Sequence, residues 1–163
     1  MYFVRYFSFI ILLIYSLFCT AQDSTVNVNP IDSVHFSHLS FGAFQKQARA
    51  QNKPYYILFT ASWCAPCHRI KSEVLTHPRI YGLSNENYLA YTLDLENFED
   101  IEINSRLFKV SQLPTILFFD ASGKKIDKAI GYFNAYYLFK KLRGHIPVSR
   151  WGAEWLEETI EDQ

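Results

Sequence analysis

The fold is decided by residues 55–67, which read YYILFTASWCAPC. The first six, 55–60, form a continuous β-rich apolar run, which is typical of a strand buried on both faces. Cys64 and Cys67 follow at once, three positions apart. The stretch therefore predicts a buried strand, a short turn, and a helix that begins at Cys64 and carries Cys67 one turn further on.

The spacing of the two cysteines suits thiol chemistry better than a structural role. A disulfide across so few residues constrains the unfolded chain little, so it adds little stability. The thiolate is the nucleophile, whereas an unperturbed cysteine with a pKa of about 8.5 is mostly protonated at neutral pH. A helix N-terminus at Cys64 presents unpaired N–H groups and the positive end of the helix dipole, which favour the thiolate. Pro66 fits this first turn because the N–H it lacks would have no partner there. We interpret Cys64 as the nucleophile and Cys67 as the resolving thiol.

Strand and helix patterns alternate on both sides of this stretch. They indicate an α/β domain over residues 34–146, with helices on both faces of the sheet. Further strands are predicted at residues 89–95, 115–119 and 126–130. Helices are predicted from Ser40 to about Asn52 with Phe41, Phe44 and Ala48 on one face, then through Cys67, Ile70 and Val74, through Ile103, Leu107 and Val110, and through Ala135, Leu138, Phe139 and Leu142.

The segment WCAPC after a buried strand, followed about fifty residues later by Leu113-Pro114-Thr115 at the start of another strand, resembles the thioredoxin family. The resemblance implies a thioredoxin-like fold, with a central mixed β-sheet flanked by helices on both faces. It also implies that Pro114 is cis and lies against the cysteines, and that the backbone of Leu113 pairs with bound substrate. Trp63 is expected to add a substrate-contacting surface, with a purely packing role as the alternative. No metal is expected, and no cofactor beyond the redox-active Cys64–Cys67 pair.

One position departs from that family. Thioredoxins commonly carry a buried acid six residues before the first cysteine, which helps to move the proton of the resolving thiol, and this chain has Leu58 there. Proton transfer must then use water or another group. The Ala-Pro dipeptide between the cysteines resembles periplasmic thioredoxin-like reductases more than the strong oxidases. We therefore expect a protein-disulfide oxidoreductase that works by dithiol-disulfide exchange, in the direction of reduction.

The first 21 residues have the anatomy of a signal peptide. One positive charge, at Arg5, precedes an uncharged stretch that ends with small residues at Cys19 and Ala21, so cleavage is expected after Ala21. An uncleaved anchor facing the periplasm is the alternative, although the apolar span is shorter than the roughly 20 residues a membrane helix needs. Export to the periplasm is expected, with a flexible spacer over residues 22–33. Residues 147–163 read as an acidic amphipathic tail that packs on the protein itself or binds a partner.

Charge and location set the expected partners. Lys and Arg total 16, as do Asp and Glu, which gives no net field to attract nucleic acid. The expected substrates are protein thiols and disulfides, and the chain is expected to be a monomer. A membrane-bound electron donor is implied, because no soluble thiol pool is assured outside the cytoplasm.

Three alternatives to disulfide exchange can be weighed on the same sequence. Cys64-x-x-Cys67-His68 is also the attachment signature of c-type haem. The lack of methionine after residue 21 and the strand-rich pattern count against a haem domain, although four other histidines could supply a second ligand: His35, His38, His77 and His145. A binding module that has inherited the fold without activity is the second alternative, and retention of both cysteines counts against it. Structural zinc would need four ligands, which the pair and scattered histidines supply poorly.

Overall fold

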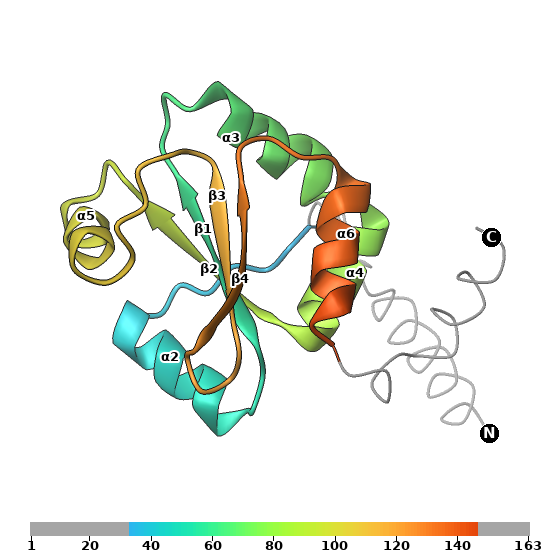
Figure 1. Cartoon of the computed structure of the whole chain (residues 1–163), viewed down its shortest axis with the longest axis horizontal. Coiled ribbons are helices and arrows are strands. Elements are labelled where there is room, and N and C mark those ends of the chain that lie inside the picture. The colour runs from blue at the N-terminus through green and yellow to red at the C-terminus, as the bar shows by residue number, and fades with distance from the viewer. Residues whose placement is uncertain (1–32, 147–163) are drawn as a thin grey trace, which may run out of the picture. The chain divides into compact units, whose positions relative to one another are not determined.

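The computed structural model describes residues 33–146, which form a four-stranded mixed sheet with helices on both faces (Figure 1). The strands are β1 (Tyr55–Thr60), β2 (Leu89–Asp94), β3 (Thr115–Phe119) and β4 (Lys125–Ile130), in the order β2-β1-β3-β4. β2 runs parallel to β1, whereas β3 is antiparallel to both β1 and β4. The predicted α/β class with a mixed sheet is confirmed. The predicted signal peptide, the predicted spacer (residues 22–33) except its last residue, and the predicted tail from residue 147 lie outside the described residues.

The helices divide between the two faces of the sheet. Helix α2 (Phe41–Ala50) and helix α5 (Phe98–Ile103) cover one face, and α5 continues into the π-helical segment η2 (Asn104–Phe108). The other face carries α3 (Ala65–Arg69) with its π-helical continuation η1 (Ile70–Val74), α4 (Pro78–Asn87) and α6 (Ala135–Gly144). Figure 1 shows the two groups on opposite sides of the strands. No helix within residues 33–146 is long and apolar enough to cross a bilayer.

Strand β1 is buried along its whole length because both of its faces are covered. Successive side chains of a strand point to opposite faces. Tyr56 and Leu58 therefore enter the core under α3, α4 and α6, whereas Tyr55, Ile57 and Phe59 enter the core under α2 and α5. This central strand ends at Thr60, and three residues separate it from Cys64, so the cysteines stand just beyond the end of a buried strand.

Helix α4 is missing from the sequence predictions. Its start has recognisable signals: the Nδ1 atom of His77 accepts the N–H of Arg79 at 3.3 Å, and Pro78 occupies the first turn. Its buried face carries Ile80 and Leu83, but also Ser84 and Asn87. Because half of the buried positions are polar, apolar periodicity alone does not reveal the helix.

The helix predicted through Ile103, Leu107 and Val110 is present as α5 and η2, and Ile103 and Val110 pack against the core as predicted, but the prediction is wrong for Leu107. Leu107 is 60% exposed, whereas Phe108 packs into the core beside Ile103. Residues 104–108 form a π-helical turn, which takes more residues than an α-helical turn. This wider turn moves the buried position from Leu107 to Phe108.

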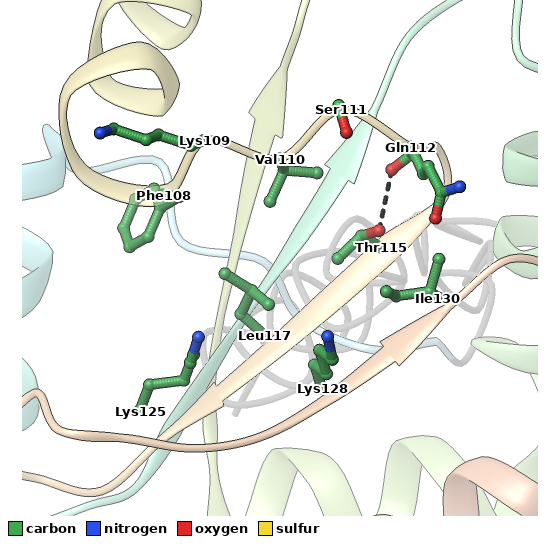
Figure 2. A pocket seen from close by; sticks show the side chains of 10 residues that line it. All are labelled: Phe108, Lys109, Val110, Ser111, Gln112, Thr115, Leu117, Lys125, Lys128 and Ile130. Atoms are coloured by element: carbon green, nitrogen blue, oxygen red, sulfur yellow. Dashed lines mark hydrogen bonds between the residues drawn. The ribbon is translucent and has the colours of Figure 1, made fainter.

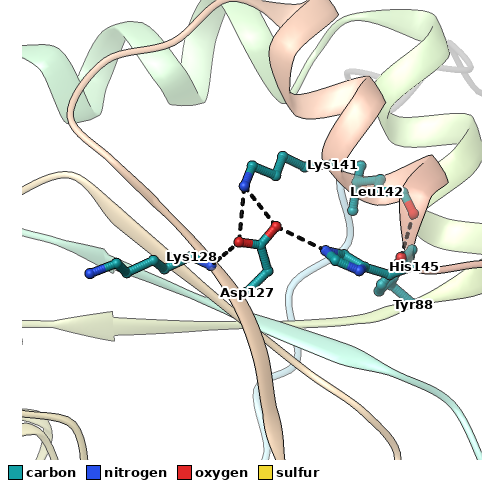
Figure 3. Close-up of polar contacts among 6 residues, drawn as sticks. All are labelled: Tyr88, Asp127, Lys128, Lys141, Leu142 and His145. Atoms are coloured by element: carbon teal, nitrogen blue, oxygen red, sulfur yellow. Dashed lines mark hydrogen bonds and ion pairs between the residues drawn. The ribbon is translucent and has the colours of Figure 1, made fainter.

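A partly buried ion cluster fastens α6 to the edge strand β4 (Figure 3). The Nζ atom of Lys141 donates to both oxygens of Asp127, at 2.9 and 2.7 Å, and the Nε2 atom of His145 lies 3.1 Å from the same carboxylate. Burial raises the pKa of the Asp127 carboxyl, but hydrogen bonds from Lys141, from the backbone of Lys128 and from His145 outweigh burial and leave that pKa lowered. The carboxylate is therefore charged at neutral pH and stabilises the helix.

Asp127→Asn is expected to lower the free energy of unfolding by about 1–3 kcal/mol at pH 7, because it leaves Lys141 without its counterion. A lowered folded-state pKa means that the stabilisation is present at neutral pH and is lost as the pH falls through that pKa, below about 4. Urea unfolding at pH 7 and pH 3 measures both effects. Glu102→Gln is the control, because the Glu102–Arg106 pair is exposed and should change stability by less than about 0.5 kcal/mol. Equal losses in the two variants at pH 7 would contradict the assignment.

Candidate active site

The two cysteines lie where the turn after β1 enters α3. Cys64 is the N-cap of α3, and its Sγ accepts the backbone N–H of Cys67 at 3.3 Å. Its carbonyl accepts the N–H groups of Cys67 and His68, at 2.9 and 3.2 Å. Cys64 and Cys67 form a disulfide with their Cα atoms 5.2 Å apart. The N–H that faces Sγ in the disulfide can also stabilise a Cys64 thiolate, which is the form that reacts.

The disulfide is shielded on its inner side and flanked by an exposed aromatic ring. Cys67 is 1% exposed and packs against Ala61, with Leu113 partly buried on the same cluster. Cys64 is 3% exposed, whereas Trp63 beside it is 70% exposed. The purely packing role considered for Trp63 does not fit this exposure. Trp63 is available to contact another molecule next to the disulfide.

The Leu113-Pro114 segment meets the cysteines from a distant part of the chain. The Leu113–Pro114 peptide bond is cis, as the family resemblance implies, and Pro114 is buried at the start of β3. The carbonyl of Pro114 accepts the N–H of Gly131 at 2.8 Å, which joins this loop to the end of β4. The structure thus brings Leu113, with the cis bond to Pro114 that follows it, to the Cys64–Cys67 pair. Their role in binding substrate stays a prediction.

The buried position before the cysteines holds no acid. Leu58 is completely buried in the core under α3, and Thr60, two residues on, points to the same face. The Thr60 hydroxyl is buried and has no hydrogen-bond partner among the described residues. Any proton released by Cys67 must therefore leave by a route other than a carboxylate at position 58. Residues 33–146 contain no cluster of three or more His, Cys, Asp or Glu side chains arranged to hold a metal.

Two side chains contact the turn before Cys64: Glu96, which no sequence pattern indicates, and His68, which the sequence indicates only as a possible haem ligand. A carboxylate oxygen of Glu96 accepts the backbone N–H of Ser62 at 2.5 Å, and the Nε2 atom of His68 lies 2.6 Å from the Ser62 carbonyl oxygen. Hydrogen bonds from the side chain and backbone of Ser62 lower the pKa of the Glu96 carboxyl. Glu96 and Ser62 are 34 residues apart, so no local motif connects them.

A groove of about 230 Å³ lies along β3 and β4 beside the Leu113-Pro114 loop (Figure 2). Its lining mixes apolar side chains, such as Leu117 and Ile130, with three lysines, Lys109, Lys125 and Lys128. Gln112 lines the end next to Leu113, where its carbonyl accepts the Thr115 hydroxyl at 2.8 Å. The groove therefore offers positive charge next to the loop that approaches the cysteines.

The strand order, the helical cysteine pair and the cis-proline opposite it together define a protein of the thioredoxin-like class. A family comparison agrees: the model of the thioredoxin-like domain matches residues 42–145. The chain belongs to this family, and the predicted membership is confirmed.

Relatives of known type support the same family. The thiol:disulfide interchange protein DsbD of Salmonella paratyphi A is 33% identical over 101 residues, which cover 57% of this chain and 18% of that protein. The chain thus spans about a fifth of the length of this curated relative. The structure of thioredoxin O2 from Arabidopsis thaliana in the oxidized state is 26% identical with a TM-score of 0.52, covering 71% of this chain and 94% of that one. A DsbH oxidoreductase structure shares the fold, with 21% identity, a TM-score of 0.57, and coverage of 72% and 90%.

Proposed function

We propose that this chain is an exported thiol-disulfide oxidoreductase that reduces disulfides in other proteins. The observation that carries the proposal is the Cys64–Cys67 disulfide at the start of α3, with the cis Leu113–Pro114 bond beside it. Similarity to the thiol:disulfide interchange protein DsbD supports disulfide exchange. Export rests on the predicted signal peptide, and the reducing direction on the Ala-Pro dipeptide between the cysteines.

The reaction transfers two electrons from the dithiol to a substrate disulfide. The Cys64 thiolate attacks one substrate sulfur, so that a Cys64–substrate disulfide forms and the other substrate sulfur leaves as a thiolate, which takes a proton from water. Cys67 then loses its proton to water and attacks Cys64 Sγ. The mixed disulfide breaks, the second substrate thiol leaves, and the enzyme retains the Cys64–Cys67 disulfide. A membrane-bound dithiol donor must reduce this disulfide before the next cycle.

The haem alternative is less well supported by the same atoms. Both cysteines are bonded to each other, and the Nε2 atom of His68 is engaged by the Ser62 carbonyl. Haem attachment would need each cysteine sulfur for the haem and a nitrogen of His68 for the iron.

To test the proposal, the exported protein is purified from the periplasm of a host competent in haem attachment, and its visible spectrum is recorded. The protein is then equilibrated in glutathione redox buffers, and its free thiols are trapped. We expect a colourless protein whose cysteine pair titrates reversibly near the thioredoxin potential of about −270 mV. A potential near −120 mV would indicate an oxidase, and a haem band would overturn the proposal.

Trp63→Ala is expected to lower kcat/KM for a protein disulfide by about 5- to 30-fold, since an exposed aromatic ring next to a reactive centre contributes about 1–2 kcal/mol to docking. The rate with a small disulfide such as cystine should change by less than about twofold, because it needs little docking surface. Tyr136→Ala on α6 is the control, since this ring is also exposed, at 60% against 70% for Trp63, and lies away from the cysteines. An equal loss with both kinds of substrate would show that Trp63 acts on the chemistry rather than on docking.

A further inference from the structure

The turn between β1 and α3 is held at one residue, Ser62, through the two peptide groups that flank its Cα. Ser62 lies two residues before Cys64. Its N–H donates to Glu96, which follows β2, and its carbonyl lies within hydrogen-bond distance of His68 on α3. A backbone hydrogen bond joins the ends of β1 and β2 beside this turn: the N–H of Leu95 donates to the carbonyl of Thr60 at 2.8 Å. The end of β2 and the first turn of α3 thus meet at Ser62.

The contact with the Ser62 carbonyl defines which ring nitrogen of His68 carries a hydrogen. A carbonyl oxygen can only accept, so the Nε2 atom of His68 must carry the hydrogen in a contact of 2.6 Å. Glu96 can only accept while it is a carboxylate, and it receives the Ser62 N–H. Each contact therefore joins a hydrogen-bond donor to an acceptor, and both donor–acceptor distances are short.

This arrangement controls how Cys64 is presented. Only Trp63 separates Ser62 from Cys64, and Cys64 must keep N-cap geometry for its Sγ to face the Cys67 N–H at 3.3 Å. A turn of three residues, 61–63, has few backbone angles, so rotation at Ser62 is passed directly to Cys64. Losing either contact would let the sulfur move away from the N–H that stabilises its thiolate.

We propose that Glu96 and His68 are positioning residues that hold the backbone N–H and C=O of Ser62 and thereby stabilise the Cys64 thiolate. This inference rests on the proposed function, because it concerns the reactive form of the same pair. It also assigns His68, the histidine of the haem-like motif, a role in thiol chemistry. The two residues act through hydrogen bonds, so glutamine should replace either of them. A glutamine at position 96 can accept the Ser62 N–H, and a glutamine at position 68 can donate to the Ser62 carbonyl.

The test compares alanine and glutamine at each position in the exported protein, reduced chemically before use. The pH midpoint of Cys64 alkylation by iodoacetamide reports thiolate stability, and the glutathione equilibrium reports the dithiol–disulfide balance. In Glu96→Ala and His68→Ala we expect about three- to tenfold less Cys64 thiolate at a given pH below the midpoint, the range for loss of one hydrogen bond. The equilibrium should shift toward the disulfide in the same variants. Glu96→Gln and His68→Gln should stay within about twofold of the wild type.

Glu99→Gln and His38→Gln are matched controls, because both side chains are exposed and neither forms a hydrogen bond to the turn at Ser62. Urea unfolding shows whether the alanine variants are folded. Unchanged midpoints in folded alanine variants would overturn the inference, as would glutamine variants as impaired as the alanine ones, since charge rather than position would then be responsible. If the wild type failed to equilibrate with glutathione, the proposed function would fail, whereas the alkylation midpoints would still decide the roles of Glu96 and His68.

Discussion

Cys67→Ser is expected to trap Cys64 in mixed disulfides with substrate proteins, while Cys64→Ser forms none. Without a thiol at position 67, nothing inside the protein can attack the Cys64–substrate bond, so the covalent complex persists. Turnover should fall at least about a thousandfold in both variants, because each thiol is required in every cycle. Only Cys67→Ser should yield complexes that survive on a non-reducing gel and disappear with dithiothreitol.

The position of Cys64 as the N-cap of α3 is the reason for assigning the roles in this order. Both cysteines are buried, at 3% and 1% exposed, but only the Sγ of Cys64 accepts a backbone N–H at the helix start, beside the exposed Trp63. The control is the double variant Cys64→Ser/Cys67→Ser, which should form no complex, because cleavage after Ala21 would also remove Cys19. Complexes that formed through Cys67 in the Cys64→Ser variant would reverse the two roles.

Leu58→Asp, which places the acid common in thioredoxins into this chain, is expected to lower the free energy of unfolding by at least about 3 kcal/mol at pH 7. Leu58 is completely buried in an apolar cluster, so the change removes packing and buries a carboxyl group. Burial would raise the pKa of that carboxyl above its unfolded value of about 3.9. The variant should therefore be most stable below about pH 4 and lose stability as the pH rises through the folded-state pKa.

Urea unfolding at pH 4 and pH 7 measures this prediction, and Leu58→Ala separates packing from charge. The alanine variant should lose about 2–5 kcal/mol at both pH values, because it adds no titratable group. A Leu58→Asp variant whose stability did not fall between pH 4 and pH 7 would show that a polar group near position 58 already accommodates an acid.

The predictable parts of the fold are those whose pattern is local and strongly apolar. The run at β1 and the run at β3 are buried as expected, and the faces of α2 and α6 lie in the core at the predicted residues. The less predictable parts have weak or misleading patterns. Helix α4 buries Ser84 and Asn87, and η2 replaces Leu107 by Phe108 in the core because a π-helical turn breaks the α-helical period.

The candidate site divides in the same way. Cys64 and Cys67 were predictable because their spacing within one helical turn brings them together whatever the rest of the chain does. Leu113 and Pro114 were predictable only through resemblance to a family. Glu96 was not predictable, since its contact with Ser62 spans 34 residues and arises from the pairing of β1 with β2.

By itself, the sequence determined the central buried strand, the helix that starts at Cys64 and the cysteine pair, because these depend on residues within a few positions of each other. Only the tertiary structure decided what surrounds the pair. The sheet register brings the cis-proline loop to one side of the disulfide and Glu96 to the turn before it, and α3 aims His68 back at Ser62. The physical reason is that such contacts depend on how whole elements pack, and strand pairing and helix packing join residues whose separation along the chain carries no pattern.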